Sequence, residues 1–117
     1  MKTNPFLVEG DINLNMKLVN YEKAELYRGT IFRFKGTYPF TEEYTDFMLT
    51  EYPGCNDKCC PFALYCVSGY HAGCLEYVFP LEAKSKDSSS IDKCWIIEHW
   101  HDNIYGECNV DEIEIIL

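Results

Sequence analysis

The sequence predicts an α+β fold, in which a single antiparallel β-sheet of about five or six strands carries one main helix, from the C-terminal half of the chain, packed on it. Short apolar or alternating segments separated by glycine and proline indicate the strands. One tryptophan-bearing segment late in the chain has helical spacing. With 117 residues, the chain has the length of one domain.

The first predicted strand lies within residues 24–35. Its end, residues 31–35, alternates between apolar and cationic side chains, which places Phe32 and Phe34 in the core and both cations in solvent. Residues 44–51 are the second predicted strand, because their apolar side chains also share one face and a Pro-Gly pair follows them.

The clearest hairpin joins residues 62–67 to residues 75–79. The segment 62–67 is continuously apolar, as in a strand that is covered on both faces. Gly69 and Gly73 in the connecting loop are simplest to interpret as turn residues. Residues 82–90 are charged and serine-rich, so we expect a surface loop there.

The predicted helix begins at the serine run. Ser89 and Asp92 are spaced as a variant capping box, and the helix would continue to about Asn103. Two tryptophans five positions apart point about 140° away from each other on a helix. We therefore expect Trp100 to pack on the sheet and Trp95 to lie toward the helix edge, near the surface.

Two pairs of carboxylates lie in the C-terminal part of the chain, one on the predicted helix and one on the last predicted strand. Glu98 and Asp102 are four residues apart on the helix, a spacing that could chelate a divalent ion or supply an acid and a base, although a solvated face is the simpler interpretation. Glu112 and Glu114 alternate with apolar residues in 110–117, which predicts a last strand with one wet face.

Residues 1–15 have little apolar content, so we expect an N-terminal arm that is dispensable for folding, followed by a single domain over 16–117. Met16 is an alternative start to Met1. The first residues lack the apolar stretch of a signal peptide, and no run is long enough to span a membrane. The sequence therefore predicts a soluble cytoplasmic protein.

The chain is strongly acidic. Its formal net charge is -9, with 10 Lys and Arg against 19 Asp and Glu, and its sequence pI is about 4.6. Such a charge repels phosphate backbones and anionic lipid and favours a basic partner. We expect no nucleic-acid and no membrane partner.

Seven cysteines are present, and without a secretory signal we expect reduced thiols and no cofactor. Three alternatives remain open. A zinc ion could be held by a cluster after the second strand together with the hairpin loop, namely Cys55, Cys59, Cys60, His71 and Cys74. A thiol nucleophile could instead pair with a histidine base, the candidates being Cys66, Cys74 or Cys108 with His71 or His99. An adjacent pair, Cys59 and Cys60, could also oxidise within its loop.

An ordered set of segments resembles immunity protein family 45 of bacterial polymorphic toxin systems. The segments are RGTIFRF (28–34), DFMLTEYP (46–53), PFAL (61–64), VSGYHAG (67–73), FPLEA (79–83), 91–100 and YGECNV (105–110). The resemblance spans roughly residues 16–116. Three features depart from the family pattern: an enlarged cysteine-rich loop at 55–60, His71 in place of an expected lysine, and the arm before Met16.

The resemblance implies a small α+β protein that is encoded beside a toxin, binds that toxin and protects the producing cell. It implies no catalytic residues, so we expect no enzyme. Its partner would be the toxin domain of the neighbouring gene, and the acidic composition favours a basic domain that is blocked by occlusion. The alternative function is a small zinc-binding or thiol-dependent module built on the 55–60 loop. The oligomeric state stays open.

Acidic side chains are the expected contacts with the toxin. The hypothesis combines Glu51 and Asp57 with acidic residues of either the last strand or the helix face. It also includes His71, which stands where the family pattern has a lysine. The residues are Glu51, Asp57, His71, Glu98, Asp102, Glu112 and Glu114.

Overall fold

The structure, a computed structural model, describes residues 15–37, 40, 43–54, 60–86 and 89–117. Six strands form one antiparallel sheet in the order β1-β8-β3-β4-β5-β6: β1 (Asn15–Lys17), β3 (Ile31–Phe34), β4 (Thr45–Glu51), β5 (Phe62–Cys66), β6 (Leu75–Val78) and β8 (Glu114–Ile116). A second, small sheet pairs β2 (Glu25–Leu26) with β7 (Ile91–Asp92). The predicted α+β class is confirmed.

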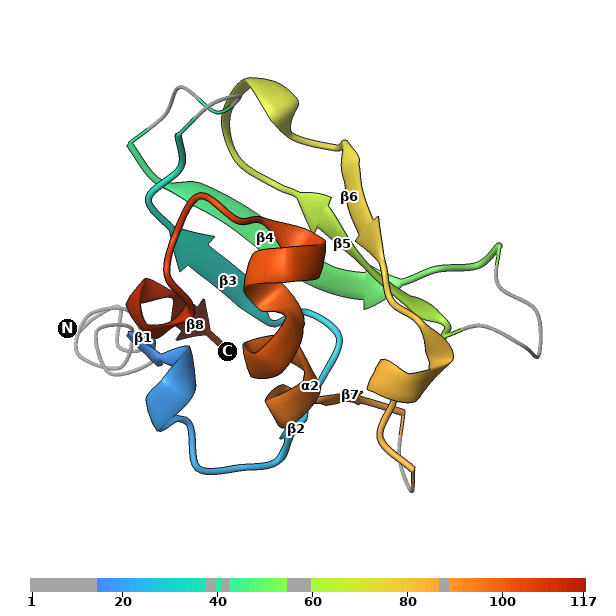
Figure 1. Cartoon of the computed structure of the whole chain (residues 1–117). Coiled ribbons are helices and arrows are strands. Elements are labelled where there is room, and N and C mark those ends of the chain that lie inside the picture. Colours follow the sequence, from blue (N-terminus) through green and yellow to red (C-terminus); the bar gives the residue numbers. More distant parts are fainter. Residues whose placement is uncertain (1–14, 38–39, 41–42, 55–59, 87–88) are drawn as a thin grey trace, which may run out of the picture.

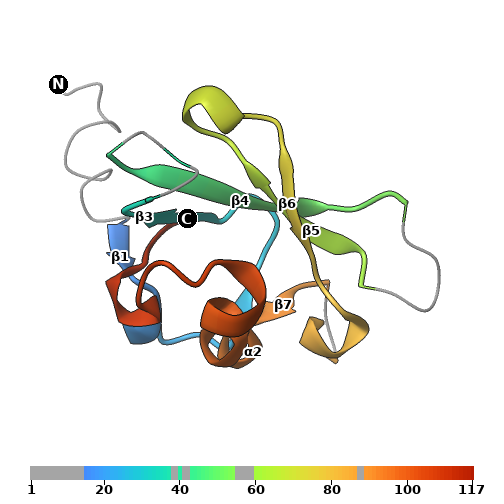
Figure 2. The same ribbon diagram turned by 45° about the horizontal axis from the view of Figure 1, so that its top comes forward.

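One helical segment covers the large sheet. It consists of α2 (Lys93–His99) and a π-helical continuation, η4 (Trp100–Ile104). Short 3-10 turns complete the chain: η1 (Leu18–Asn20), η2 (Gly69–His71), η3 (Leu81–Ala83) and η5 (Val110–Glu112). Figures 1 and 2 show α2, η5 and the small sheet on the same side of the large sheet. No described helix is long and apolar enough to cross a membrane.

The core lies between that helical segment and the inner face of the sheet. Phe32 and Phe34 are buried as their alternation predicts, and the same face of β4 buries Phe47 and Leu49. Three of these phenylalanine rings surround the buried Trp100, with ring centroids 5.5 to 6.2 Å away. Aromatic packing on the inner face therefore joins the helix to the sheet.

The predicted strand at 24–35 divides into β2 and β3, which join different sheets. A turn separates them: Thr30 N donates to Tyr27 O at 3.1 Å, and Gly29 adopts a φ of 96°. Positive φ is costly for a residue with a side chain, so glycine permits this change of direction. The alternating pattern located β3, but it gave no sign of this break.

The hairpin of β5 and β6 is confirmed, with Gly69 and Gly73 at positive φ at either end of its loop. The prediction that residues 62–67 are covered on both faces is wrong at Tyr65, which lies on the outer face and is only half-buried, and at Val67, which is exposed. The inner side chains of β5 are buried, because α2 and η4 pack on that side alone among the described residues.

The predicted exposure of Trp95 is wrong. Both tryptophans are buried, with 7% of Trp95 and 0% of Trp100 exposed. The helix changes from α to π geometry at Trp100, so the angular offset of a regular α-helix does not apply. The ring of Trp95 also packs against those of Tyr77 and Phe79, at centroid distances of 6.4 and 5.9 Å.

The helix starts later than predicted. Its N-cap is Asp92, whose side chain accepts a hydrogen bond from Cys94 N at 3.0 Å. The capping box predicted from Ser89 does not form, because Ile91 is drawn into the core and pairs with Leu26 in the small sheet. The end of the helical segment at Ile104 agrees with the predicted end near Asn103.

The last predicted strand, 110–117, is shorter in the structure. Residues Val110–Glu112 form the turn η5, and only Glu114–Ile116 pair within the sheet. Leu117, which the alternation places in the core, is 51% exposed. Among the described residues, Glu114–Ile116 pair with β1 on one side and with β3 on the other.

Thr45 carries a hydroxyl that is costly to bury. Its side chain is fully buried, and Oγ1 has no hydrogen-bond partner within the described part of the chain. We expect Thr45→Val to raise the free energy of unfolding by about 1 kcal/mol, because it removes an unsatisfied polar group and keeps the β-branched shape. Urea denaturation measures the change.

Thr50 is the matched control on the same strand. Its hydroxyl donates to Glu51 O at 3.3 Å and is only half-buried, so Thr50→Val should bring no gain. A Thr45→Val protein that is no more stable than the original chain would show that the hydroxyl is satisfied in solution.

Candidate functional site

The exposed surface of the helical segment and the turns after it is acidic. From Cys94 to Leu117 the sequence contains no Lys or Arg. The exposed carboxylates of this stretch are Glu98, Asp102, Glu107, Asp111 and Glu112. They lie on α2, η4, the following turn and η5, on the side of the sheet that carries the helix (Figure 2). We call these five residues the acidic helical layer.

The packing of the helix fixes which side chains remain in this layer. Trp95, Ile96 and Trp100 are buried, so Glu98 and Asp102 point into solvent. The change from α to π geometry falls between these two carboxylates, so the i,i+4 spacing predicted for them does not apply as it would in a regular α-helix. Both contribute charge to the surface.

The helix histidines are engaged by their neighbours. The ring of His99 stacks on Trp95 at 4.1 Å, and its Nδ1 lies 2.9 Å from the carbonyl oxygen of Trp95. Nδ1 of His101 lies 3.1 Å from Oδ1 of Asp102, and both side chains are exposed. His99 is thus held by the helix itself through Trp95.

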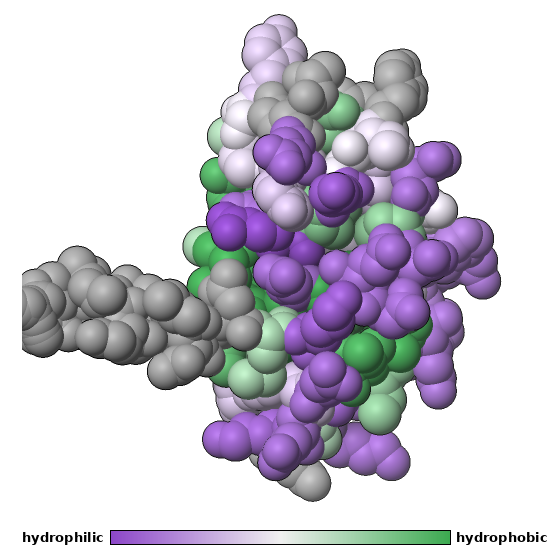
Figure 3. All heavy atoms as spheres, turned by 90° about the vertical axis from the view of Figure 1, so that its left-hand side faces the viewer, coloured by the Kyte–Doolittle hydropathy of each residue, from purple (hydrophilic) through white to green (hydrophobic). Residues whose placement is uncertain are grey.

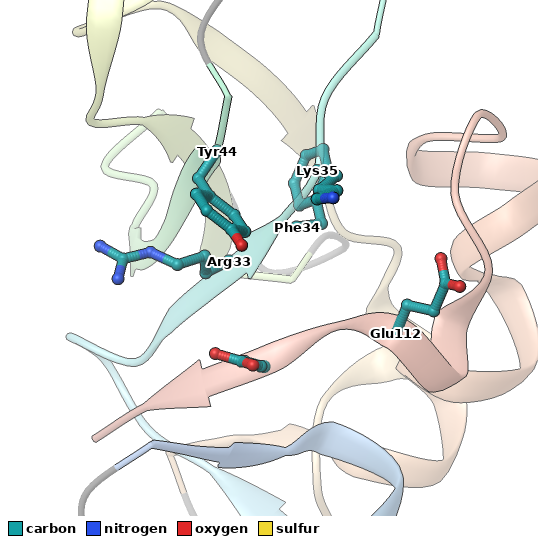
Figure 4. A pocket seen from close by; sticks show the side chains of 6 residues that line it. Arg33, Phe34, Lys35, Tyr44 and Glu112 are labelled. Atoms are coloured by element: carbon teal, nitrogen blue, oxygen red, sulfur yellow. The ribbon is translucent and has the colours of Figure 1, made fainter. Parts of the chain in front are cut away.

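Glu114 belongs to a different surface. It lies on β8, where its Cα neighbours across the strands are Lys17 and Arg33. With Glu112 it lines a depression of about 250 Å³, whose other lining residues are Arg33, Phe34, Lys35 and Tyr44. Figure 4 shows Arg33, Lys35 and Tyr44 on one side of this depression and Glu112 on the other.

Arg33 is the centre of the charge pattern on the outer face. Its Nε and Nη2 donate to the two carboxylate oxygens of Asp46 at 2.8 and 2.9 Å, a bidentate pair. This hydrogen bonding, and then the nearby negative charges of Asp46 and Glu114, raise the pKa of Arg33 above its ordinary value against the opposing effect of burial. The cation therefore neutralises carboxylates here, so this face is less acidic than the helical layer.

The other predicted contact residues are dispersed. Glu51 ends β4, and its carboxylate lies 3.6 Å from Arg28 Nε in an exposed pair. His71 lies at the tip of the β5–β6 hairpin, with its ring 5.1 Å from that of Phe40. Asp57 falls outside the described residues. The structure thus places Glu98, Asp102 and Glu112 in one layer and does not bring Glu51, His71 or Glu114 into it.

Of the residues proposed for zinc, the described ones lie at two ends of β5. Cys60 precedes this strand, whereas Cys74 follows it, with Cys74 O accepting from Cys66 N at 2.9 Å. Six residues of extended chain separate Cys60 from Cys66 by roughly 15 to 20 Å. Zinc ligands lie within about 2.3 Å of the ion, so Cys60 does not share one site with His71 and Cys74. Cys55 and Cys59 fall outside the described residues.

Two of the thiols proposed as nucleophiles, those of Cys66 and Cys108, have a pKa that burial raises. Cys66 is buried and donates to Ser68 O at 3.3 Å, while Cys108 is half-buried. Burial raises the pKa of both thiols, and it raises the pKa of Cys60 as well. A raised pKa leaves less of the reactive thiolate at neutral pH.

The rate of alkylation should differ between the exposed and the buried cysteines. Near neutral pH, we expect iodoacetamide to modify the exposed Cys74 and Cys94 first, and Cys60 and Cys66 only when the chain unfolds. Peptide mass spectrometry after timed exposure measures each site, and the same reaction in denaturant provides the control in which all of them react. Fast native modification of Cys66 would contradict the account and favour a thiol-dependent role.

Sequence reasoning missed two features of these surfaces. Glu107 and Asp111 belong to the acidic helical layer, and the absence of Lys and Arg after Lys93 is a signal that could have found them. The pairing of Arg33 with Asp46 depends on strand register, which the sequence does not state.

Comparison with known proteins gives one match. A family model described as Immunity protein 45 matches residues 18–115. No curated protein and no solved structure matches the chain. The match begins at the buried Leu18 and ends at the buried Ile115, so it includes nearly all of the described fold.

Proposed function

The chain belongs to the immunity protein 45 family, and from this we propose that it binds a cognate toxin domain, encoded by a neighbouring gene, and neutralises it by occlusion. The proposed partner surface is the acidic helical layer, and the proposed toxin domain is basic. The observation that supports this most is the run of exposed carboxylates on α2, η4 and η5 without a Lys or Arg among them.

Charge gives the proposed binding its physical basis. A face of one sign raises the local concentration of an oppositely charged partner and can increase the association rate by roughly 10 to 1000-fold at low salt. It also suppresses partners of the wrong charge. Five exposed carboxylates on one layer, within a chain of net charge -9, provide such a field.

Occlusion requires no reaction by this chain, so the proposed role is non-enzymatic. The histidines of the helix are held by Trp95 and Asp102, and burial leaves the thiols of Cys66 and Cys108 less ionised. An inhibitor that acts by covering a toxin needs a rigid scaffold and a complementary surface, which are what the sheet and the helical layer supply. We place this encounter in the cytoplasm of the producing cell.

Co-expression tests the proposal. The gene product encoded beside this chain is expressed with and without it, and both growth and co-purification are scored. We expect the chain to restore growth and to be recovered in a complex with the neighbouring product. Failure of both would overturn the proposal, whereas rescue without a complex would contradict occlusion as its mechanism.

A further inference from the structure

The outer face of the large sheet carries an apolar row of side chains. A sheet face in water normally carries polar side chains. Here one row of neighbours across four strands consists of Ile116, Ile31, Met48 and Tyr65, and all four side chains keep partial exposure. Among the described segments, α2, η4 and η5 lie on the opposite side (Figures 1 and 2).

Figure 3 shows the same contrast from the side of β1. Hydrophobic residues follow the left margin of this view, which is the side of the sheet away from α2, while hydrophilic residues cover most of the remaining surface around a smaller hydrophobic patch on the right. An apolar face of this kind is typical of a surface that another sheet or chain covers.

A row of charges runs beside the apolar row. Strand register places Lys17 next to Glu114, Glu114 next to Arg33, and Arg33 next to Asp46. Along β1, β8, β3 and β4 the signs therefore alternate as positive, negative, positive, negative. We call these four residues the charge ladder.

The ladder is complementary to itself. A two-fold axis that runs parallel to the strands, between β8 and β3, reverses the order of the four strands in a second copy. By strand register each position then meets the opposite sign: position 17 faces the second copy's Asp46, and Glu114 faces its Arg33. Within one copy, Lys17 Nζ donates to Asp111 O at 3.3 Å, so Lys17 reorients toward Asp46 in the dimer. The same rotation sets Ile116 against Ile31 in the apolar row.

We propose that a second copy of this chain packs face to face on the outer side of the sheet, about this two-fold axis. Aligned sheets keep their strand directions within about 30° of each other, so the rows nearest the axis stay opposite one another. A two-fold axis across the strands on the ladder would instead set each charge against its own copy, which is unfavourable. The resulting interface is isologous, the commonest kind in homodimers.

The dimer and the proposed toxin surface use opposite sides of the molecule. Glu112 lines the same depression as Arg33 and Glu114 and so borders the dimer interface. The rest of the acidic helical layer stays exposed in such a dimer, because it lies on the face of the sheet that carries α2. Glu114 is then an interface residue between copies, and it is removed from the set of toxin contacts. Each dimer would present two acidic layers.

The mass of the purified chain in solution tests the dimer. Light scattering over a concentration series should give twice the 13.7 kDa chain mass. Ile31→Lys places a charge at the apolar row beside the axis and should give the chain mass. Val19→Lys, on the exposed turn η1, makes a similar change elsewhere and should leave the dimer intact. A chain mass of 13.7 kDa for the original protein at every concentration would overturn the proposal, as would an Ile31→Lys variant that stays dimeric.

Mixing two charge variants tests the axis itself. Lys17→Glu and Asp46→Lys each set like charges against each other in a homodimer, so each alone should dimerise weakly. In a mixed dimer the two substitutions face each other and the original charges face each other, so mixing should restore dimerisation. Circular dichroism confirms that each variant is folded. A mixture with no more dimer than the separate variants would show that the two copies meet by another arrangement.

Discussion

Replacement of Trp100 by alanine should lower the free energy of unfolding by about 3 to 5 kcal/mol, the loss expected for removing a buried aromatic side chain. Trp100 is fully buried, and its ring packs against those of Phe32, Phe34 and Phe47. These rings come from β3 and β4, so the substitution opens a cavity where the helical segment meets the centre of the sheet. Urea denaturation followed by circular dichroism measures the loss.

Tyr44→Ala is the control for that change. It also removes an aromatic ring, but Tyr44 is 47% exposed and stands before β4 on the surface. We expect a change within about 0.5 kcal/mol, as for most surface substitutions. A Trp100→Ala loss no larger than that of Tyr44→Ala would contradict the placement of the helical segment on the inner face of the sheet.

Reversal of two charges in the acidic helical layer should weaken toxin binding by at least about tenfold at low salt, equivalent to one decade in Kd. The variant carries Glu98→Lys and Asp102→Lys, both at exposed positions on the helical segment. Because rim charges act mainly on encounter, most of the loss should appear in the association rate and should shrink as salt increases. Stopped-flow or biosensor kinetics with the toxin domain measure both.

A second double variant is the control for the change in net charge. Glu22→Lys and Glu43→Lys change the net charge by the same amount at exposed positions outside the layer. We expect this control to bind nearly as well as the original chain. If the Glu98 and Asp102 reversals leave binding at low salt unchanged, the layer is not the toxin surface, whatever the control does.

The sequence predicted the strands of the sheet best where the local pattern agreed with the final packing. The alternation at Ile31–Phe34 and the apolar run at Phe62–Cys66 each became a strand of the large sheet. The failures share a cause, since each depended on a distant partner. Ile91 joined a small sheet because Leu26 lay opposite it, and Trp95 was buried because residues after β5 covered it.

The candidate surfaces were predictable to different degrees. The acidic character of the helix could be predicted, because charge is visible in composition and exposed positions follow from the buried face. The charge ladder could not, because the neighbours Lys17, Glu114 and Arg33 are far apart in sequence and meet only through strand register. A shift of one residue in that register would send these side chains to the other face.

The most direct measurement is a titration of the purified chain with the purified toxin domain encoded beside it, at low and at high salt. The account predicts a complex with one toxin domain for each copy of this chain, formed at low salt and weakened as salt increases. No complex at low salt, or a complex that salt leaves unchanged, would contradict the claim that the acidic helical layer binds the toxin.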